Sequence, residues 1–198
     1  MQVTPARTRA VRLTCHPTTR DRRVRSIEVQ VQRTPEGSLA FSFCLTGDVA
    51  RLRIPDARMA TRGDGLWRHT CFEAFVAARQ GSAYCEFNFS PSGKWAAYRF
   101  SSYRRGGPLD EATDPRITLR TGPDRLELDA LVTAVALPAE RGASLRLALS
   151  AVIEDDDGGL CYWAFRHPPG EPDFHHRDGF AVELDAQAEN DPVKVEKQ

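Results

Sequence analysis

A short apolar segment of the sequence carries a polar side chain at every second position, and it runs from Tyr84 to Ser90. Successive side chains of a β-strand point to opposite faces, so residues two apart share a face. The segment therefore predicts a strand whose one face bears a phenol, a carboxylate, an amide and a hydroxyl, from Tyr84, Glu86, Asn88 and Ser90. Such groups can donate hydrogen bonds to a polar ligand and accept them from it.

A turn follows this strand directly, because the sequence Ser-Pro-Ser-Gly at 90–93 has Pro and Gly where a type I turn prefers them. We predict a hairpin in which Ser90 pairs with Gly93. This register sets Asn88 opposite Trp95 and Tyr84 opposite Arg99, all on the face of Glu86. The opposite face is then expected to enter the core, with Cys85, Phe87, Phe89, Ala96, Tyr98 and Phe100.

The polar face of this hairpin has the composition of a sugar-binding surface. Trp95 and Tyr84 can stack on the apolar face of a pyranose ring, while Glu86, Asn88 and Arg99 can hydrogen-bond its hydroxyls. A purely structural interpretation is also open. In it, Glu86 and Arg99 form a diagonal ion pair across the strands, and Trp95 is half-buried without binding anything.

Another carboxylate, Glu73, lies between aromatic residues in a segment where Trp67 and Glu73 have the same strand parity. A buried carboxylate is costly unless it is paired, so we expect Arg99 or Arg104 as its partner. Whether Glu73 contacts a ligand or forms an ion pair that fixes the register of the sheet stays open.

The segment from His167 to His176 is a Pro- and Gly-rich loop with three histidines, and it is expected to fold over the end of the domain. We expect Phe174 to pack inward and one histidine, His175, to reach the polar face. Adjacent histidines with Asp173 can also hold a metal, but the spacings typical of zinc sites are absent, so no metal is predicted.

Two further chemistries are weaker alternatives. Glu73 and Glu86 could act as the carboxylate pair of a glycoside hydrolase if their strands are neighbours. A haem would need axial ligands, for which Met59 with His175 is the least implausible pair, and no cofactor is predicted. We therefore expect binding rather than catalysis.

Three runs of sequence resemble the bacterial DOMON-like domains related to family 9 carbohydrate-binding modules: LWRHTCFEAFVA, YCEFNFSPSGKWAAYRFSSYR and HPPGEPDFHHRDGF. The resemblance extends from about Leu13 to Leu184. It implies an antiparallel β-sandwich that binds a saccharide or, in other branches, a haem. The candidate ligand-binding residues are Trp67, Glu73, Tyr84, Glu86, Asn88, Trp95, Arg99, Tyr103 and His175.

The rest of the chain predicts an all-β protein. Turn signals separate short alternating segments at intervals of about ten residues, and no long segment has helical periodicity. We expect a single antiparallel β-sandwich of jelly-roll or immunoglobulin-like type with about ten strands over residues 1–185. A polar, disordered tail is expected at 186–198, and a long loop bordering the site from Arg104 to Pro115.

Composition restricts the partners that the protein can have. The 198 residues include 27 basic and 27 acidic side chains, so no net field attracts nucleic acid or an anionic membrane. We expect a small-molecule ligand, no nucleic-acid or membrane partner, and a cytoplasmic location, since neither a signal peptide nor a membrane span is evident. The five cysteines are scattered singly, which favours reduced thiols. The sequence gives no indication of the oligomeric state.

Overall fold

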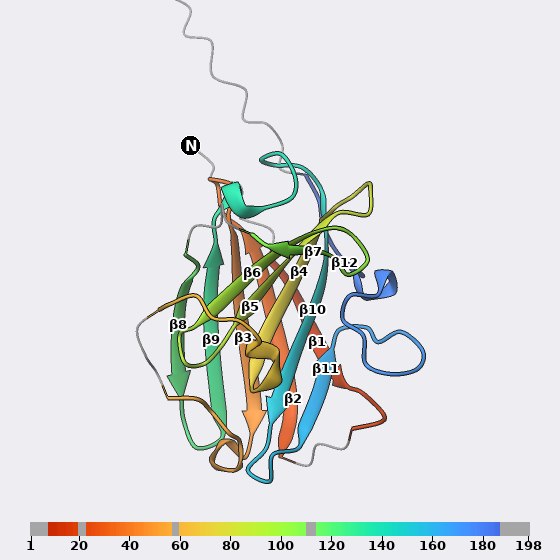
Figure 1. The fold of residues 1–198 in the computed structure, drawn as a ribbon. Helices are drawn as coiled ribbons and strands as arrows, with labels where there is room; N and C mark the ends of the chain where they lie inside the picture. Colours follow the sequence, from red (N-terminus) through yellow and green to blue (C-terminus); the bar gives the residue numbers. More distant parts are fainter. Residues whose placement is uncertain (1–7, 20–22, 57–59, 110–113, 187–198) are drawn as a thin grey trace, which may run out of the picture.

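The structure is a computed structural model, and it describes residues 8–19, 23–56, 60–109 and 114–186. These residues form an all-β fold, as predicted (Figure 1). The strands are β1 (Thr8–Cys15), β2 (Val24–Arg33), β3 (Leu39–Gly47), β4 (Cys71–Ala78), β5 (Tyr84–Phe89), β6 (Trp95–Ser102), β7 (Arg105–Pro108), β8 (Arg116–Thr121), β9 (Arg125–Val132), β10 (Leu145–Glu154), β11 (Leu160–Ala164) and β12 (Val182–Leu184). Short 3-10 turns are η1 (Val49–Arg51), η2 (Leu66–Arg68), η3 (Ala134–Ala136) and η4 (Arg177–Gly179).

Two expectations about the elements were wrong. The described residues form 12 strands rather than about ten. One of these strands, β7, lies in the segment from Arg104 to Pro115 that was expected to be a loop, and it pairs with β6. Of the predicted tail at 186–198, only Ala186 is among the described residues. None of the described helices is long and apolar enough to span a membrane.

The strands form one antiparallel path, β7-β6-β5-β4-β10-β11-β1-β2-β3-β9-β8, with β12 also paired to β10. The path folds over on itself at β1, whose first part pairs with β2 and whose last residues, Thr14 and Cys15, pair with β11. We call β1, β2, β3, β9 and β8 layer A, and β11, β12, β10, β4, β5, β6 and β7 layer B. The two layers form the predicted β-sandwich.

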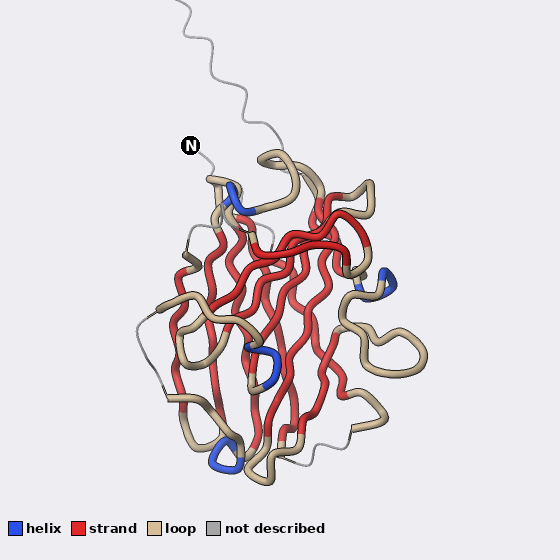
Figure 2. Tube along the Cα trace, viewed as in Figure 1, coloured by secondary structure: helices blue, strands red, loops and turns tan. Residues whose placement is uncertain are grey.

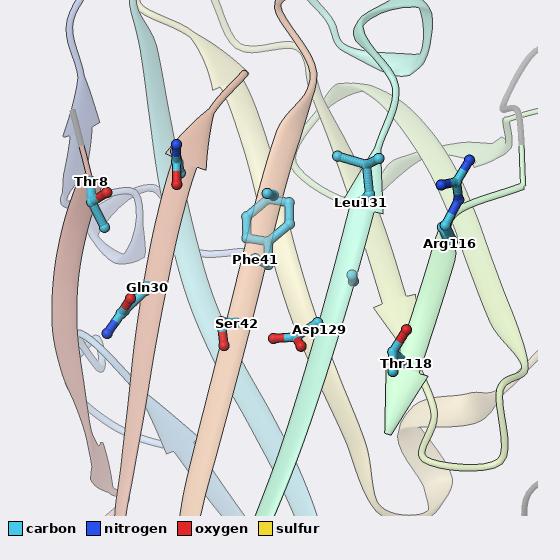
Figure 3. A pocket seen from close by; sticks show the side chains of 11 residues that line it. Thr8, Gln30, Phe41, Ser42, Arg116, Thr118, Asp129 and Leu131 are labelled. Atoms are coloured by element: carbon cyan, nitrogen blue, oxygen red, sulfur yellow. The ribbon is translucent and has the colours of Figure 1, made fainter. Parts of the chain in front are cut away.

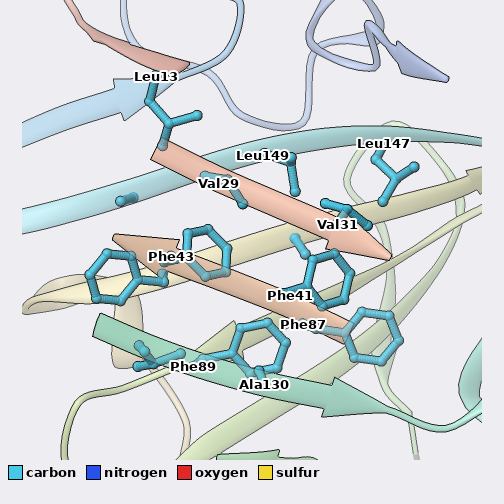
Figure 4. Close-up of a cluster of buried hydrophobic side chains, with 14 of the residues drawn as sticks. Leu13, Val29, Val31, Phe41, Phe43, Phe87, Phe89, Ala130, Leu147 and Leu149 are labelled. Atoms are coloured by element: carbon cyan, nitrogen blue, oxygen red, sulfur yellow. The ribbon is translucent and has the colours of Figure 1, made fainter. Parts of the chain in front are cut away.

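The core lies between the layers, where alternate residues of both meet (Figure 4). Phe43 on β3 contacts Phe72 on β4, with ring centroids 5.1 Å apart, and Phe41 contacts Phe89 on β5 at 6.0 Å. These strands are not neighbours in the sheet, so the contacts join the two layers face to face. Burial of such aromatic side chains is the main stabilising contribution to a sandwich of this kind.

The predicted register of the β5–β6 hairpin was wrong by one residue. The amide of Gly93 donates to Ser90 O and the amide of Ser90 to Lys94 O, so the loop has three residues, with Gly93 in the left-handed region at φ 86°. This is the form in which a type I turn is followed by a left-handed glycine. It pairs Phe89 with Trp95 rather than Asn88 with Trp95.

A shift of one residue exchanges the two faces of a strand. Trp95 therefore packs in the core, where it is 3% exposed, and Arg99 lies opposite Cys85, on the face turned from Glu86. Tyr98 pairs with Glu86 and Phe100 with Tyr84, so both join the polar face that Trp95 and Arg99 were expected to occupy. The expected core positions of Cys85, Phe87 and Phe89 are confirmed.

Candidate functional site

The outer face of layer B, turned away from the core, carries two glutamates on neighbouring strands. Glu73 on β4 pairs with Asn88 on β5 and with Ser150 on β10, which makes one row across the face. Glu86 lies in the next row, between Phe75 and Tyr98. Only 2% of Glu73, 5% of Glu86 and none of Asn88 is exposed, although these side chains point away from the core.

A segment of the chain crosses this face and covers part of it. Thr61 and Gly63 hydrogen-bond to Trp95 at the edge of β6, and the chain then passes over the face to reach β4. We call residues 64–70 the strap. Its 3-10 turn, η2, contacts β4 and β5, and Figure 2 shows it in blue in front of the sheet, close to the start of β4. Asp64 Oδ1 accepts a hydrogen bond from the Tyr98 hydroxyl at 3.1 Å.

The strap carries Trp67, which is 47% exposed. The guanidinium of Arg68 lies over its ring, 5.2 Å from the centroid. Trp67 was expected to share a strand with Glu73, but β4 begins only at Cys71 and Trp67 belongs to η2. The other surface of the Trp67 ring is therefore accessible to solvent beside the face that carries Glu86.

A second covering element is the β11–β12 loop, residues 165–181, seen at the right of Figure 1. It brings His175 onto the face, where the imidazole is enclosed by the rings of Phe75, Phe100 and Tyr84, with centroids at 5.1, 5.2 and 5.9 Å. Phe174 packs inward against the ring of Tyr162, as expected. The loop therefore fixes a histidine in an aromatic cage beside the glutamates.

The hydrogen bonds of Tyr84 indicate which nitrogen of His175 carries the imidazole proton. The Tyr84 hydroxyl accepts from the backbone N–H of Arg104 at 3.1 Å and lies 2.8 Å from His175 Nδ1. Its proton is then available to Nδ1, which leaves the imidazole proton on Nε2, 3.6 Å from Glu86 Oε2. Burial, with the field of Arg104, lowers the pKa of His175 to about 4, so the ring is neutral at physiological pH.

Both glutamates are held close to their protonated forms. Burial raises the pKa of Glu86 to about 7, against the opposing effects of the Asn88 amide, which donates at 2.7 Å, and of Arg104. Burial and the charge of Glu86 raise the pKa of Glu73 well above its usual range, although the Ser150 hydroxyl donates to it at 3.3 Å. Two buried carboxylates on one face cannot both ionise cheaply, so the pair retains a proton near neutral pH.

One hydrogen-bond acceptor on the face lacks a donor. The buried Asn88 Oδ1 has no partner in the part of the chain that the structure describes, because the amide nitrogen is turned to Glu86. A buried polar atom without a partner is costly, and its retention in a folded protein calls for a specific reason. A bound molecule that donates a hydrogen bond would supply one.

The rim of the site is tied together by Asp173. It accepts hydrogen bonds from the Tyr103 hydroxyl at 2.8 Å, the Arg104 guanidinium at 2.9 Å and the backbone N–H of His175 at 3.1 Å. Arg104 has φ 52°, a left-handed conformation that is strained for a residue other than glycine. These contacts connect the β6–β7 turn to the β11–β12 loop and hold His175 in place.

The structure thus brings together five of the nine candidate residues: Glu73, Tyr84, Glu86, Asn88 and His175. Trp67 lies on the strap and Tyr103 on the rim, whereas Trp95 and Arg99 lie on the other face of β6, as the corrected register requires. Arg99 is therefore not the partner of Glu73. The charge of Arg104 lowers the pKa of Glu86 instead. Sequence reasoning missed Tyr98, Ser150 and Asp64. Of these, Tyr98 would have been placed on this face by a hairpin with a three-residue turn.

The other two histidines of the loop do not converge on His175. His167 Nε2 lies 2.8 Å from Thr14 O, and His176 Nδ1 lies 3.7 Å from Asp178. Met59 lies outside the described residues, so the structure does not test the haem ligand pair. The acidic cluster found within the described ranges, at Asp155–Asp157, is elsewhere in the fold, and Arg23 forms ion pairs with it.

A hollow of about 350 Å³ lies on the opposite side of the molecule, on the outer face of layer A (Figure 3). Gln30, Ser42 and Asp129 contribute polar groups to it, and the small side chains of Ala40 and Ser42 on β3 leave room for it. It contains none of the buried carboxylates. The chemistry of the outer face of layer B is the more specific, so we take that face as the candidate site.

Comparisons with known proteins agree with the fold. No protein-family model and no curated protein matches the sequence. Among solved structures, a Bacteroides uniformis protein whose name assigns it to carbohydrate binding matches with a TM-score of 0.65 and 12% identity, over 88% of this chain and 84% of that one. A family 9 carbohydrate-binding module from Caldicellulosiruptor kristjanssonii, solved with glucose, matches with a TM-score of 0.53 and 10% identity, over 98% and 92% of the two chains. At these identities the similarity shows that the chain shares their β-sandwich fold.

Proposed function

We propose that the protein is a saccharide-binding module whose ligand lies on the outer face of layer B, between the strap and the β11–β12 loop. The observation that carries the proposal is the cluster of Glu73, Glu86 and Asn88, buried on a face that is not the core, with an amide oxygen that has no donor among the described residues. Sugar hydroxyls are the donors that such a face would accept.

Other features of the face support the proposal. Trp67, half exposed on the strap, offers a ring on which a pyranose can stack. Tyr98 presents a hydroxyl at the edge of the same face, where burial and the carboxylate of Asp64 raise its pKa to about 12 and keep it protonated. Both neighbours by fold are carbohydrate-binding by name, and one was solved with glucose. We include in this proposal that the chain is a DOMON-like relative of family 9 modules.

The first test is calorimetric titration of the full chain with neutral monosaccharides and short oligosaccharides. Glu86→Gln keeps the size of the side chain, and Trp67→Ala removes the exposed ring. We expect each variant to weaken saccharide binding at least tenfold while the melting temperature stays within a few degrees. Gln30→Ala, in the hollow on layer A, is the matched control and should bind normally.

The outcomes separate the sites clearly. Loss of binding in Gln30→Ala, with normal binding in Glu86→Gln, would move the ligand to layer A. Absence of binding by every saccharide would refute the proposed function. An absorbance spectrum of the purified protein, taken beforehand, checks the haem alternative, because a Soret band would identify a haem protein.

A second candidate function, glycoside hydrolysis, is favoured by one observation. The two glutamates share a face, and the pKa of Glu86 near 7 suits a carboxyl group that donates a proton. In that case oligosaccharides would be cleaved, and both Glu73→Gln and Glu86→Gln would abolish product formation. A binding module would leave the oligosaccharides intact.

A further inference from the structure

We infer that the site selects amino sugars, whose ammonium group would lie against Glu86 and Asn88, over neutral saccharides of the same size. The inference rests on the proposed function and specifies its ligand class. It starts from the balance of charge and hydrogen-bond capacity on the outer face of layer B.

The ionisable groups around Glu86 are either neutral or already paired with one another. Burial and the charge of Glu86 raise the pKa of Glu73 on β4, so this group stays protonated beside an ionised Glu86. Asp64 contributes a carboxylate from the strap, where it accepts a hydrogen bond from the Tyr98 hydroxyl. From the β6–β7 turn, Arg104 is a cation whose field reaches Glu86, but its guanidinium is already ion-paired with Asp173. The imidazole of His175, the nearest group from the β11–β12 loop, is neutral.

The remaining titratable groups do not form an ion pair with Glu86 in the part of the chain that the structure describes. Tyr84 and Tyr98 are protonated phenols with raised pKa values, and burial, with the nearby glutamates, raises that of the Cys71 thiol. On β10, Arg146 lies opposite Ala77, away from the row that contains Glu73. The guanidinium of Arg68 lies over the ring of Trp67. A cationic ligand would therefore meet, in Glu86, a carboxylate with no Lys or Arg at ion-pair distance among the described residues.

An ammonium group also matches the hydrogen-bond capacity of the site. It has three donors and no acceptor, and the face presents Asn88 Oδ1 without a described donor and Glu86 Oε2 with only the long contact to His175 Nε2, at 3.6 Å. Hydrogen bonds between an ionised donor and a carboxylate are roughly twice as strong as neutral ones. A hydroxyl at the same position would satisfy one of these acceptors without neutralising the charge.

The inference predicts a proton linkage that a neutral sugar does not have. An ammonium ligand binds the ionised form of Glu86, which is the minor form below pH 7, because burial raises the pKa of this group to about 7. Binding at pH 6 therefore releases a proton, and affinity rises about fivefold from pH 6 to pH 7, as the ionised fraction grows. A neutral ligand that accepts a hydrogen bond from the protonated carboxyl group shows no such rise in affinity.

The experiment compares glucosamine, glucose, N-acetylglucosamine and glucuronate by calorimetry with the full chain, at pH 6 and pH 7, in two buffers of different ionisation enthalpy. We expect glucosamine to bind roughly tenfold more tightly than glucose, as a charge-assisted hydrogen bond replaces a neutral one. Glucuronate should bind most weakly, and only glucosamine should release a proton at pH 6.

Glu86→Gln supplies the matched variant. It should bring the affinity for glucosamine down to that for glucose, whereas Gln30→Ala on layer A should leave the preference unchanged. Equal binding of glucose and glucosamine by the native protein would overturn the inference and leave saccharide binding intact. If the protein bound none of the four sugars and no longer saccharide, the proposed function itself would be refuted. Because the sugars are compared on the native chain, the result does not depend on the folding of any variant.

Discussion

The hydroxyl oxygen of Tyr84 lies 2.8 Å from His175 Nδ1 and joins β5 to a loop 91 residues further along the chain. The same oxygen accepts the backbone N–H of Arg104, so one phenol connects the strand, the β6–β7 turn and the β11–β12 loop. His175 is thereby held with its other nitrogen toward Glu86. The contact thus fixes the position of the imidazole and the direction of its Nε2.

Removal of that hydroxyl should release the loop. In Tyr84→Phe, both His175 Nδ1 and the N–H of Arg104 lose a partner in a partly buried place, which should cost about 1–3 kcal/mol of unfolding free energy. Urea unfolding measures the loss, and faster amide exchange in residues 165–181 would locate it. Tyr162→Phe is the control, because no hydrogen bond of its hydroxyl is found among the described residues. Equal effects of the two variants would contradict the role of the Tyr84 hydroxyl.

The pKa shifts of Glu86 and His175 predict opposite pH dependences of stability. The folded protein holds Glu86 at a pKa of about 7 against an ordinary value of 4.5, so this group stabilises the fold at low pH and loses that effect as pH rises from 4.5 to 7. The folded pKa of His175 is about 4 against 6.5, so its contribution is present above pH 6.5 and lost as pH falls toward 4. Each effect is of the order of 1–3 kcal/mol.

Single variants should separate the two effects. Urea unfolding of Glu86→Gln between pH 4.5 and 6.5 should show stability that falls less with rising pH than that of the native protein, because the Glu86 contribution is lost while those of His175 and Glu73 remain. In His175→Gln, stability should fall over the same range. Parallel curves for the two variants would mean that the groups titrate in the folded protein as they do in the unfolded chain.

The architecture could be predicted from the sequence because it depends on alternation. In the segments around Ile27 and around Phe41 and Phe43, every second residue lies in the core. A strand with this pattern can turn only one of its two faces toward the core. Tyr84, Glu86 and Asn88 were placed on one face for the same reason. Their burial was not predictable, since it depends on a strap and a loop that lie far from β5 in sequence.

Trp95 and Arg99 show where sequence reasoning was limited. The sequence Ser-Pro-Ser-Gly suits a two-residue connection and also a three-residue loop ending in a left-handed glycine, and the choice decides the face of every residue in β6. Here Trp95 fits the space between the layers, whereas Tyr98 can place its hydroxyl beside Asp64. Packing across the core, which one sequence does not reveal, selects between the two registers.

The left-handed conformation of Gly93 should therefore be important for the hairpin. In Gly93→Ala the methyl group is strained at φ 86°, and we expect a loss of about 1–2 kcal/mol in unfolding free energy. Gly107→Ala on β7 is the control, because φ there is not in the left-handed range and an added Cβ would meet nothing within 4 Å. Thermal unfolding of both variants makes the comparison, and a tolerated Gly93→Ala would argue against the three-residue loop.

The last prediction concerns the contribution of Phe87, which packs between the two layers, to the free energy of unfolding. This residue is fully buried in the core cluster, on the face of β5 opposite to Glu86 and Asn88 (Figure 4). Phe87→Ala removes a ring between the layers and should cost about 3–5 kcal/mol, since the surrounding strands can close the cavity only in part. Val135→Ala, at a position that is 62% exposed, should stay within about 0.5 kcal/mol of the native protein. Denaturant unfolding monitored by tryptophan fluorescence measures both changes. A small effect at Phe87 would mean that the layers pack less closely than the ring contacts between β3, β4 and β5 indicate.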